Sequence, residues 1–128
     1  MDSKEKIILI VDDELHIKQS FSYFFEDREW QVFTADSGEA ALELLKTMTC
    51  SVAIVDIRMR GMDGESFIRI ASERYPSMFF VVCTGSPMYE ISEDLIQLPC
   101  VVDKVFGKPV MDMNGLEETI LRLIEGCI

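Results

Sequence analysis

The stretch Val52–Asp56, with the sequence VAIVD, decides the fold. Four consecutive apolar residues lead into one aspartate, and the turn-rich segment 57–64 follows. A short apolar run bounded by turn residues is typical of a strand that is buried on both faces, as in a parallel sheet. The carboxylate of Asp56 then lies at the carboxyl end of the strand, where open α/β sheets bind their ligands. Taken alone, this aspartate is also compatible with a simple turn. The residues at the ends of the other strands decide between a turn and a functional site.

The composition fits one compact domain, which we expect to span residues 1–128. The chain is 48% hydrophobic, enough for a core. Its formal net charge of −11 argues against nucleic-acid binding, which depends on cationic surfaces. We find no signal peptide and no membrane span, and we expect a cytoplasmic protein. The cysteines lack C-x-x-C spacing and indicate reduced core thiols rather than a disulfide or zinc framework: Cys50, Cys83, Cys100 and Cys127.

A second apolar run, Ile7–Val11, predicts a second buried strand, and three acids follow it: Asp12, Asp13 and Glu14. Two carboxylates about 5 Å apart at an effective dielectric of about 20 repel each other by roughly 3 kcal/mol. A bound cation offsets that cost. One of the two aspartates can instead cap the following helix, but capping does not easily explain both.

Apolar periodicity predicts that strands and helices alternate along the rest of the chain. Further strands are expected at 30–34, with an exposed, edge-like pattern, at 78–83 and at 105–106. Helices are expected at about 14–28, from 36 to about 48, around 67–71, weakly between Pro87 and Pro99, and up to Cys127, the last with a capping box formed by Asn114 and Glu117. Five strand–helix repeats predict right-handed crossovers and an α/β fold with a parallel sheet covered on both faces.

Chemically useful groups follow four of the five predicted strands. Besides the acids after the first and third strands, Thr84 follows the fourth and Lys108 the fifth. Since parallel strands end at the same edge of a sheet, these groups should converge. Together they resemble a phosphoryl-transfer site, in which aspartates bind Mg²⁺, Asp56 is the nucleophile, and the lysine and hydroxyl take phosphoryl oxygens. The single histidine, His16, is expected to be solvated because no nucleophile is paired with it.

Four segments carry a family resemblance: ILIVDDE (8–14), VDIRMRGMDG (55–64), Thr84-Gly85 and FGKP (106–109). In this order and spacing they resemble the receiver domains of two-component response regulators, from Lys6 to about Glu125. The resemblance implies a flavodoxin-like sheet of five parallel strands, in the order 2-1-3-4-5, flanked by five helices.

The resemblance also implies roles for individual residues. Asp56 would accept a phosphoryl group from a sensor histidine kinase or a phosphotransfer protein, and the domain would then act on a downstream protein target or form a homodimer. Thr84 and Phe106 occupy the positions of the switch pair, and Lys108 that of the phosphate-binding lysine, which usually precedes a cis-proline. The Mg²⁺ ligands would be three carboxylates and a backbone carbonyl, those of Asp12, Asp13, Asp56 and Arg58.

Some positions depart from the family pattern. Arg60 stands where the loop usually has proline, which leaves a backbone N–H free. The usual Gly-Ala pair before the last strand is replaced by residues 100–104, and Pro87 and Pro99 should shorten the fourth helix. These changes affect the expected signalling face, whereas every residue expected in the phosphoryl-transfer site is present.

Three other functions are compatible with parts of this pattern. A flavin-binding flavodoxin needs a phosphate loop rich in Ser, Thr and Gly after the first strand, where this chain has acids. A phosphatase of the haloacid-dehalogenase type needs a second acid two residues after the nucleophile, where this chain has Arg58. The main alternative is a degenerate receiver that serves as a phosphate-insensitive protein-interaction module.

Overall fold

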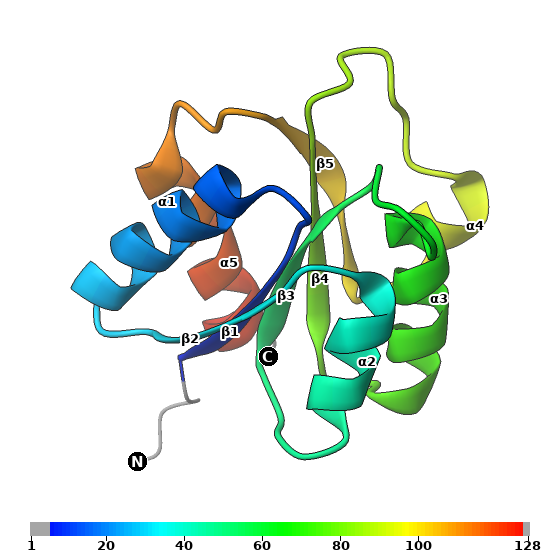
Figure 1. Cartoon of the computed structure of the whole chain (residues 1–128), viewed down its shortest axis with the longest axis horizontal. Coiled ribbons are helices and arrows are strands. Elements are labelled where there is room, and N and C mark those ends of the chain that lie inside the picture. Colours follow the sequence, from blue (N-terminus) through cyan, green and yellow to red (C-terminus); the bar gives the residue numbers. More distant parts are fainter. Residues whose placement is uncertain (1–5, 127–128) are drawn as a thin grey trace.

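Five parallel strands form one sheet with helices on both faces (Figure 1). The computed structural model describes residues 6–126. The strand order β2-β1-β3-β4-β5 confirms the flavodoxin-like order expected from the sequence. The strands are β1 (Ile7–Val11), β2 (Gln31–Ala35), β3 (Val52–Asp56), β4 (Phe79–Thr84) and β5 (Val101–Gly107). The helices are α1 (Leu15–Asp27), α2 (Gly38–Leu45), α3 (Gly64–Arg74), α4 (Glu93–Ile96) and α5 (Met113–Glu125).

Strands β1 and β3 are apolar because the sheet is covered on both faces. Every residue of β3 is buried, and residues 8–11 of β1 have no exposed surface. Strand β1 pairs with β2 on one side and with β3 on the other, without a shift in register. These ladders fix the carboxyl ends of β1 and β3 relative to each other. Strand β2 lies at one edge of the sheet, which confirms the edge position expected from its more polar pattern.

Helices α1 and α5 cover one face of the sheet, and α2, α3 and α4 cover the other (Figure 1). Side chains alternate between these two cores along each strand. Ile54 packs in the core that contains Phe25 of α1 and Ile120 of α5, whereas the next residue, Val55, packs in the core that contains Phe67 of α3. The phenylalanine stripe of the first predicted helix is therefore core, as expected.

The predicted capping box at the start of the last helix is wrong. The side chain of Asp112 caps α5 instead, by accepting a 2.9 Å hydrogen bond from a backbone N–H three residues later. Glu117 is buried and accepts hydrogen bonds from Trp30 Nε1, at 2.8 Å, and from Arg28, at 3.2 Å. Asn114 accepts another hydrogen bond from Arg28. Asn114 and Glu117 have the spacing of a capping box, but their side chains accept hydrogen bonds from Arg28 and Trp30 instead.

The last strand is longer than predicted, since β5 begins at Val101 rather than at Val105. Asp103 and Lys104 interrupt the apolar pattern and hide the strand in the sequence. Both are exposed because β5 is the other edge of the sheet. The pairing of β4 with β5 shifts register at this level.

Smaller differences concern the second helix and the cysteines. Helix α2 ends before Met48, which was expected on it. Among the described cysteines, Cys83 is buried, Cys50 and Cys100 are half-buried, and all three are free thiols, while Cys127 lies outside the described residues. Across residues 6–126 no helix has the length and apolar character required to cross a bilayer.

Candidate functional site

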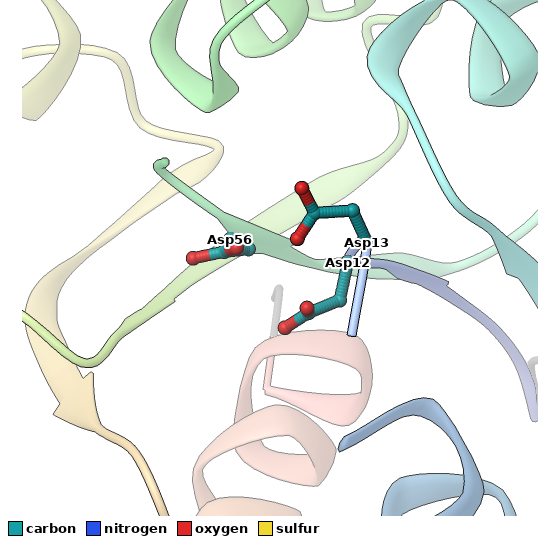
Figure 2. A group of neighbouring side chains, drawn as sticks. All are labelled: Asp12, Asp13 and Asp56. Atoms are coloured by element: carbon teal, nitrogen blue, oxygen red, sulfur yellow. The ribbon is translucent and has the colours of Figure 1, made fainter. Parts of the chain in front are cut away.

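Three aspartate side chains meet at the carboxyl edge of the sheet. Asp12 directly follows β1 and is 2% exposed, and Asp56 is the last residue of β3 and is 4% exposed. Asp13 is half-buried. One carboxylate oxygen from each lies within 4.8 Å of the other two, and Figure 2 shows the three groups around a common space. The unbroken parallel register of β1 and β3 brings them together.

The turn after β1 is held by the first aspartate. The backbone N–H of Asp12 donates to Ala35 of β2 at 3.1 Å, and its carboxylate accepts from the N–H of Glu14 at 2.9 Å. Glu14 is the N-cap residue of α1, and no side chain caps that helix. The alternative that one of the two aspartates caps the first helix is therefore wrong.

The start of α3 packs directly behind Asp56. The N–H of Gly64 donates to the carbonyl of Ile57 at 2.9 Å. A Cβ atom on Gly64 would overlap the Asp56 carbonyl oxygen and would lie 2.8 Å from the Ile57 Cα. Glycine is required here because two backbones approach closely, and this contact fixes the backbone of Asp56.

Lys108 places one ammonium among the carboxylates. Its Nζ lies 3.0 Å from Asp12 Oδ2 and 3.4 Å from Asp56 Oδ1. It also donates to Glu14 Oε1 at 2.8 Å. The lysine side chain is only 9% exposed, and the Lys108–Pro109 peptide bond is cis. Burial lowers the pKa of Lys108, but the hydrogen bonds to Glu14 and Asp12 outweigh it and the pKa is raised, so the ammonium stays charged.

The electrostatics of this cluster alter the titration of the central aspartate. Burial raises the pKa of Asp56 to about 6, and the neighbouring Asp12 carboxylate adds to the rise. Lys108 and the backbone of Arg58 oppose it. Asp56 is therefore mostly ionised at pH 7, but it is more basic than an ordinary aspartate, and a more basic carboxylate is a better nucleophile.

An open pocket of about 470 Å³ lies in front of these groups. Thr84, buried at the end of β4, lines it, and the Thr84 hydroxyl accepts a hydrogen bond from the N–H of Ser86 at 3.2 Å. The remaining lining residues come from the ends of β1, β3, β4 and β5: Asp13, Glu14, Asp56, Arg58, Gly85, Ser86 and Lys108. The pocket is large enough for a phosphoryl group and its ligands.

The model of the response regulator receiver domain family matches residues 8–120. The chain belongs to the response regulator receiver domains. It is 34% identical over 96 residues to the hydrogenase transcriptional regulatory protein HoxA of Cupriavidus necator, a match that covers 75% of this chain and 19% of HoxA. This receiver therefore corresponds to about a fifth of the length of that relative.

Solved structures agree with this assignment. The receiver is similar to a CheY-like response regulator receiver domain protein from Methanospirillum hungatei, with a TM-score of 0.80, 26% identity, and coverage of 95% of this chain and 96% of the other. It shares its fold with the response regulator TrrA of Thermotoga maritima, solved in complex with Mg(2+)-BeF, with a TM-score of 0.74, 21% identity, and coverage of 90% and 98%.

The acidic pocket of this receiver fits a magnesium ion. Oxygen ligands of an octahedral Mg²⁺ at about 2.1 Å lie about 3 to 4 Å apart, and the three aspartates offer oxygens within 4.8 Å of one another. An ion held by all three would require these oxygens to approach one another by up to about 1 Å. Arg58, whose carbonyl was expected to be the fourth ligand, lines the same pocket. All the donors are hard oxygens, as Mg²⁺ prefers.

Two further residues named from the sequence lie outside the pocket of this receiver. Phe106 is on β5, is 7% exposed, and lies beneath Lys104, whose Nζ is 4.8 Å from the ring centre. His16 is exposed on the first turn of α1, as expected.

Sequence reasoning missed the part that Glu14 plays in the receiver pocket. Glu14 was counted among the acids after the first strand, but its pairing with Lys108 was not foreseen. A signal was present in the sequence: three successive acids converge with a single lysine, so a third carboxylate has to face either that lysine or solvent.

Proposed function

We propose that this receiver, a single domain over residues 1–128, accepts a phosphoryl group on Asp56 from a sensor histidine kinase or a phosphotransfer protein, with Mg²⁺ as its cofactor. One observation carries the proposal. A buried carboxylate at a strand end faces an open pocket, with a second carboxylate and an ammonium beside it. Such a constellation supplies a nucleophile, a cation site and a phosphate ligand together.

In the transfer step, a carboxylate oxygen of Asp56 attacks the phosphorus of a phosphohistidine. A P–O bond forms as the P–N bond breaks, and the departing imidazole keeps the electron pair of that bond. The Lys108 ammonium and the Thr84 hydroxyl donate hydrogen bonds to the phosphoryl oxygens, where negative charge must be balanced. Mg²⁺, when bound, supplies further positive charge to those oxygens.

The phosphoacceptor is tested by mass spectrometry. Incubation with acetyl phosphate and Mg²⁺ should add one phosphoryl group that hydroxylamine removes, as expected for an acyl phosphate. Asp56→Asn should abolish the added mass, whereas Asp27→Asn, at the far end of α1, should keep it. If Asp56→Asn gains the same mass at the same rate, the assignment is wrong.

The metal site is tested by thermal unfolding. Added Mg²⁺ should stabilise the native protein by mass action, by about 2.7 kcal/mol at one hundred times its Kd. In chelator, Asp13→Asn should raise the melting temperature because one like charge is removed. Mg²⁺ should then stabilise the variant less than the native protein. Equal Mg²⁺ shifts in both would exclude Asp13 from the metal site.

We further propose that the output is a protein-interaction surface formed by residues 86–108 and α5. A phosphoryl group on Asp56 would draw the Thr84 hydroxyl inward, and the ring of Phe106 would respond by packing alone, since it has no hydroxyl. Thr84→Ala should leave Asp56 able to accept phosphate, more slowly because one hydrogen-bond donor to the phosphoryl group is lost. It should also weaken the response of Phe106, measured as spectral changes around that ring on phosphorylation. Identical changes in both proteins would exclude this switch.

The partners in this proposal are proteins: the phosphodonor, and either a downstream target or a second copy of the chain. With a net charge of −11, no affinity for DNA is expected at physiological salt. A cytoplasmic location, away from membranes, belongs to the same proposal.

One observation favours the alternative of a phosphate-insensitive module. Phe106 is already 7% exposed in the structure, so inward movement has little surface left to bury. Amide hydrogen exchange with and without beryllofluoride distinguishes the two functions. Altered protection in residues 86–108 supports the switch, and an unchanged map supports the module.

A further inference from the structure

The ammonium of Lys108 lies among three carboxylates: it donates hydrogen bonds to Glu14 and Asp12 and forms an ion pair with Asp56. An ammonium carries three N–H groups. Nζ lies 2.8 Å from Glu14, 3.0 Å from Asp12 and 3.4 Å from Asp56. With the side chain 9% exposed, little room is left for another ligand. A phosphoryl oxygen that approaches Lys108 therefore has to compete with these carboxylates for the ammonium.

The three carboxylates are not equally easy to displace. Asp12 and Asp56 are 3% and 4% exposed in their side chains and sit at the ends of β1 and β3. Asp12 is tied further by the hydrogen bond from the N–H of Glu14. The Glu14 side chain is 60% exposed, so water can replace its contact with the lysine. Glu14 is the partner that Lys108 gives up with the least loss.

Building on the phosphoacceptor function proposed above, we propose that Glu14 is a positioning residue that competes with the phosphoryl group for Lys108 and so limits how readily the site accepts phosphate. The Lys108–Glu14 contact persists until a phosphoryl oxygen takes the place of the glutamate. Glu14 also lines the pocket mouth, where its charge repels an incoming phosphate.

Two substitutions of Glu14 distinguish its competition with the phosphoryl group for Lys108 from simple charge repulsion of the incoming phosphate. Glu14→Gln removes the charge and keeps the length, so it weakens both effects. Glu14→Asp keeps the charge but shortens the side chain by one methylene, about 1.5 Å, so its carboxylate no longer reaches Lys108 from the same backbone position. Glu26→Gln is the matched control, because it makes the same charge change at an exposed position near the other end of α1.

The test measures the initial rate of phosphorylation against acetyl phosphate concentration, at saturating Mg²⁺. Both Glu14→Gln and Glu14→Asp should raise kcat/KM about twofold to fivefold, the size of one exposed ion pair, and Glu26→Gln should not. The ¹⁵Nζ resonance of Lys108 should move in both Glu14 variants without phosphodonor. A role confined to folding would leave that signal in place.

The results of this experiment test the phosphoacceptor function and the role of Glu14 separately. If the native protein gains no phosphoryl mass, the phosphoacceptor function itself fails. If all four proteins are phosphorylated at the same rate, only the role of Glu14 is overturned. A faster Glu14→Gln with Glu14→Asp at the native rate would mean that repulsion alone acts, and would also overturn competition for Lys108.

Discussion

The two sides of the pocket are held by different kinds of interaction. On one side, β1 and β3 are buried, pair in unbroken register, and carry the three aspartates. On the other side, residues 85–100 leave the sheet after β4 and contain only one helical turn, Glu93–Ile96 (Figure 1). The first region is fixed by a backbone ladder and apolar packing. The second has no ladder of its own; polar side-chain contacts hold it, together with the buried side chains of Ile91 and Leu95.

The carboxylate of Glu65, on the first turn of α3, holds residues 85–100 in place. It accepts hydrogen bonds from the hydroxyls of Tyr89 and Ser92 and from the Ser92 N–H, the last at 3.2 Å. Arg69, one turn along α3, pairs with Asp94 at 3.0 Å. Burial raises the pKa of Glu65, but hydrogen bonds from Ser92 and Tyr89 outweigh it and lower the pKa overall. The polar contacts of this segment therefore depend on a charged carboxylate.

This difference indicates where a change of state costs least free energy. Breaking a buried ladder exposes apolar surface and unpaired backbone groups, whereas polar contacts at the surface exchange with water. The region of β1 and β3 should therefore keep the chemistry in place while residues 85–100 change conformation. Comparing the two regions one substitution at a time tests this division.

The largest expected effect comes from comparing two glycines, Gly64 at the start of α3 and Gly85 directly after β4. Gly64→Ala forces a methyl group into the Asp56 backbone and should destabilise the protein by about 3 kcal/mol. Gly85→Ala meets no atom within 4 Å and should change the free energy of unfolding by less than about 0.5 kcal/mol. Denaturant unfolding measures both. Equal losses would mean that the two regions are equally rigid.

The next effect is a pH dependence from Asp56. Its pKa is raised to about 6 in the folded state, from 3.8, so folding favours its protonated form. This stability is fully present below about pH 4 and is lost as pH rises through about 6, by at most about 3 kcal/mol. In chelator, Asp56→Asn should therefore gain stability relative to the native protein between pH 4 and 7, and no further above it. A difference that does not vary with pH would contradict the burial of this charge.

A smaller effect is expected in residues 85–100. Glu65→Ala leaves the donors of Tyr89 and Ser92 without their acceptor and should cost about 1 to 2 kcal/mol. Hydrogen exchange should quicken in residues 85–100 and stay unchanged in β1 and β3. The control is Glu73→Ala, an exposed position on the same helix. Faster exchange across the whole sheet would show that the segment is not an independent unit.

The smallest effect should come from Asp94→Asn, which removes the exposed pair with Arg69. Solvent and salt screen such a pair, so any loss of stability should fall below that of Glu65→Ala and disappear at high salt. Thermal unfolding at two salt concentrations measures it. A loss that persists at high salt would assign this pair a larger part in holding α4.

The region of β1 and β3 was predictable from the sequence. In residues 85–100 the short fourth helix between Pro87 and Pro99 was predicted and is confirmed, but the side-chain contacts that hold the segment were not predicted. Uninterrupted apolar runs fix β1 and β3, and parallel pairing then brings Asp12 and Asp56 to one edge. The hydrogen bonds of Glu65 to Tyr89 and Ser92 join positions 24 and 27 residues apart and leave no periodic signal. The sequence predicts strand β5 too short for a related reason. Its exposed positions at the sheet edge carry charged residues, and these interrupt the apolar pattern that marks a strand.

The buried contact between Trp30 and Glu117 allows tryptophan fluorescence to report on the packing of α5. Trp30 is the only tryptophan in the chain, and it is 3% exposed just before β2, at the amino edge of the sheet and away from the pocket. Its indole N–H donates to Glu117 on α5 at 2.8 Å. Intrinsic fluorescence therefore reports whether α5 is docked, and a phosphate at the opposite edge cannot quench it by contact. A change in tryptophan emission on phosphorylation would therefore mean that α5 has moved relative to Trp30.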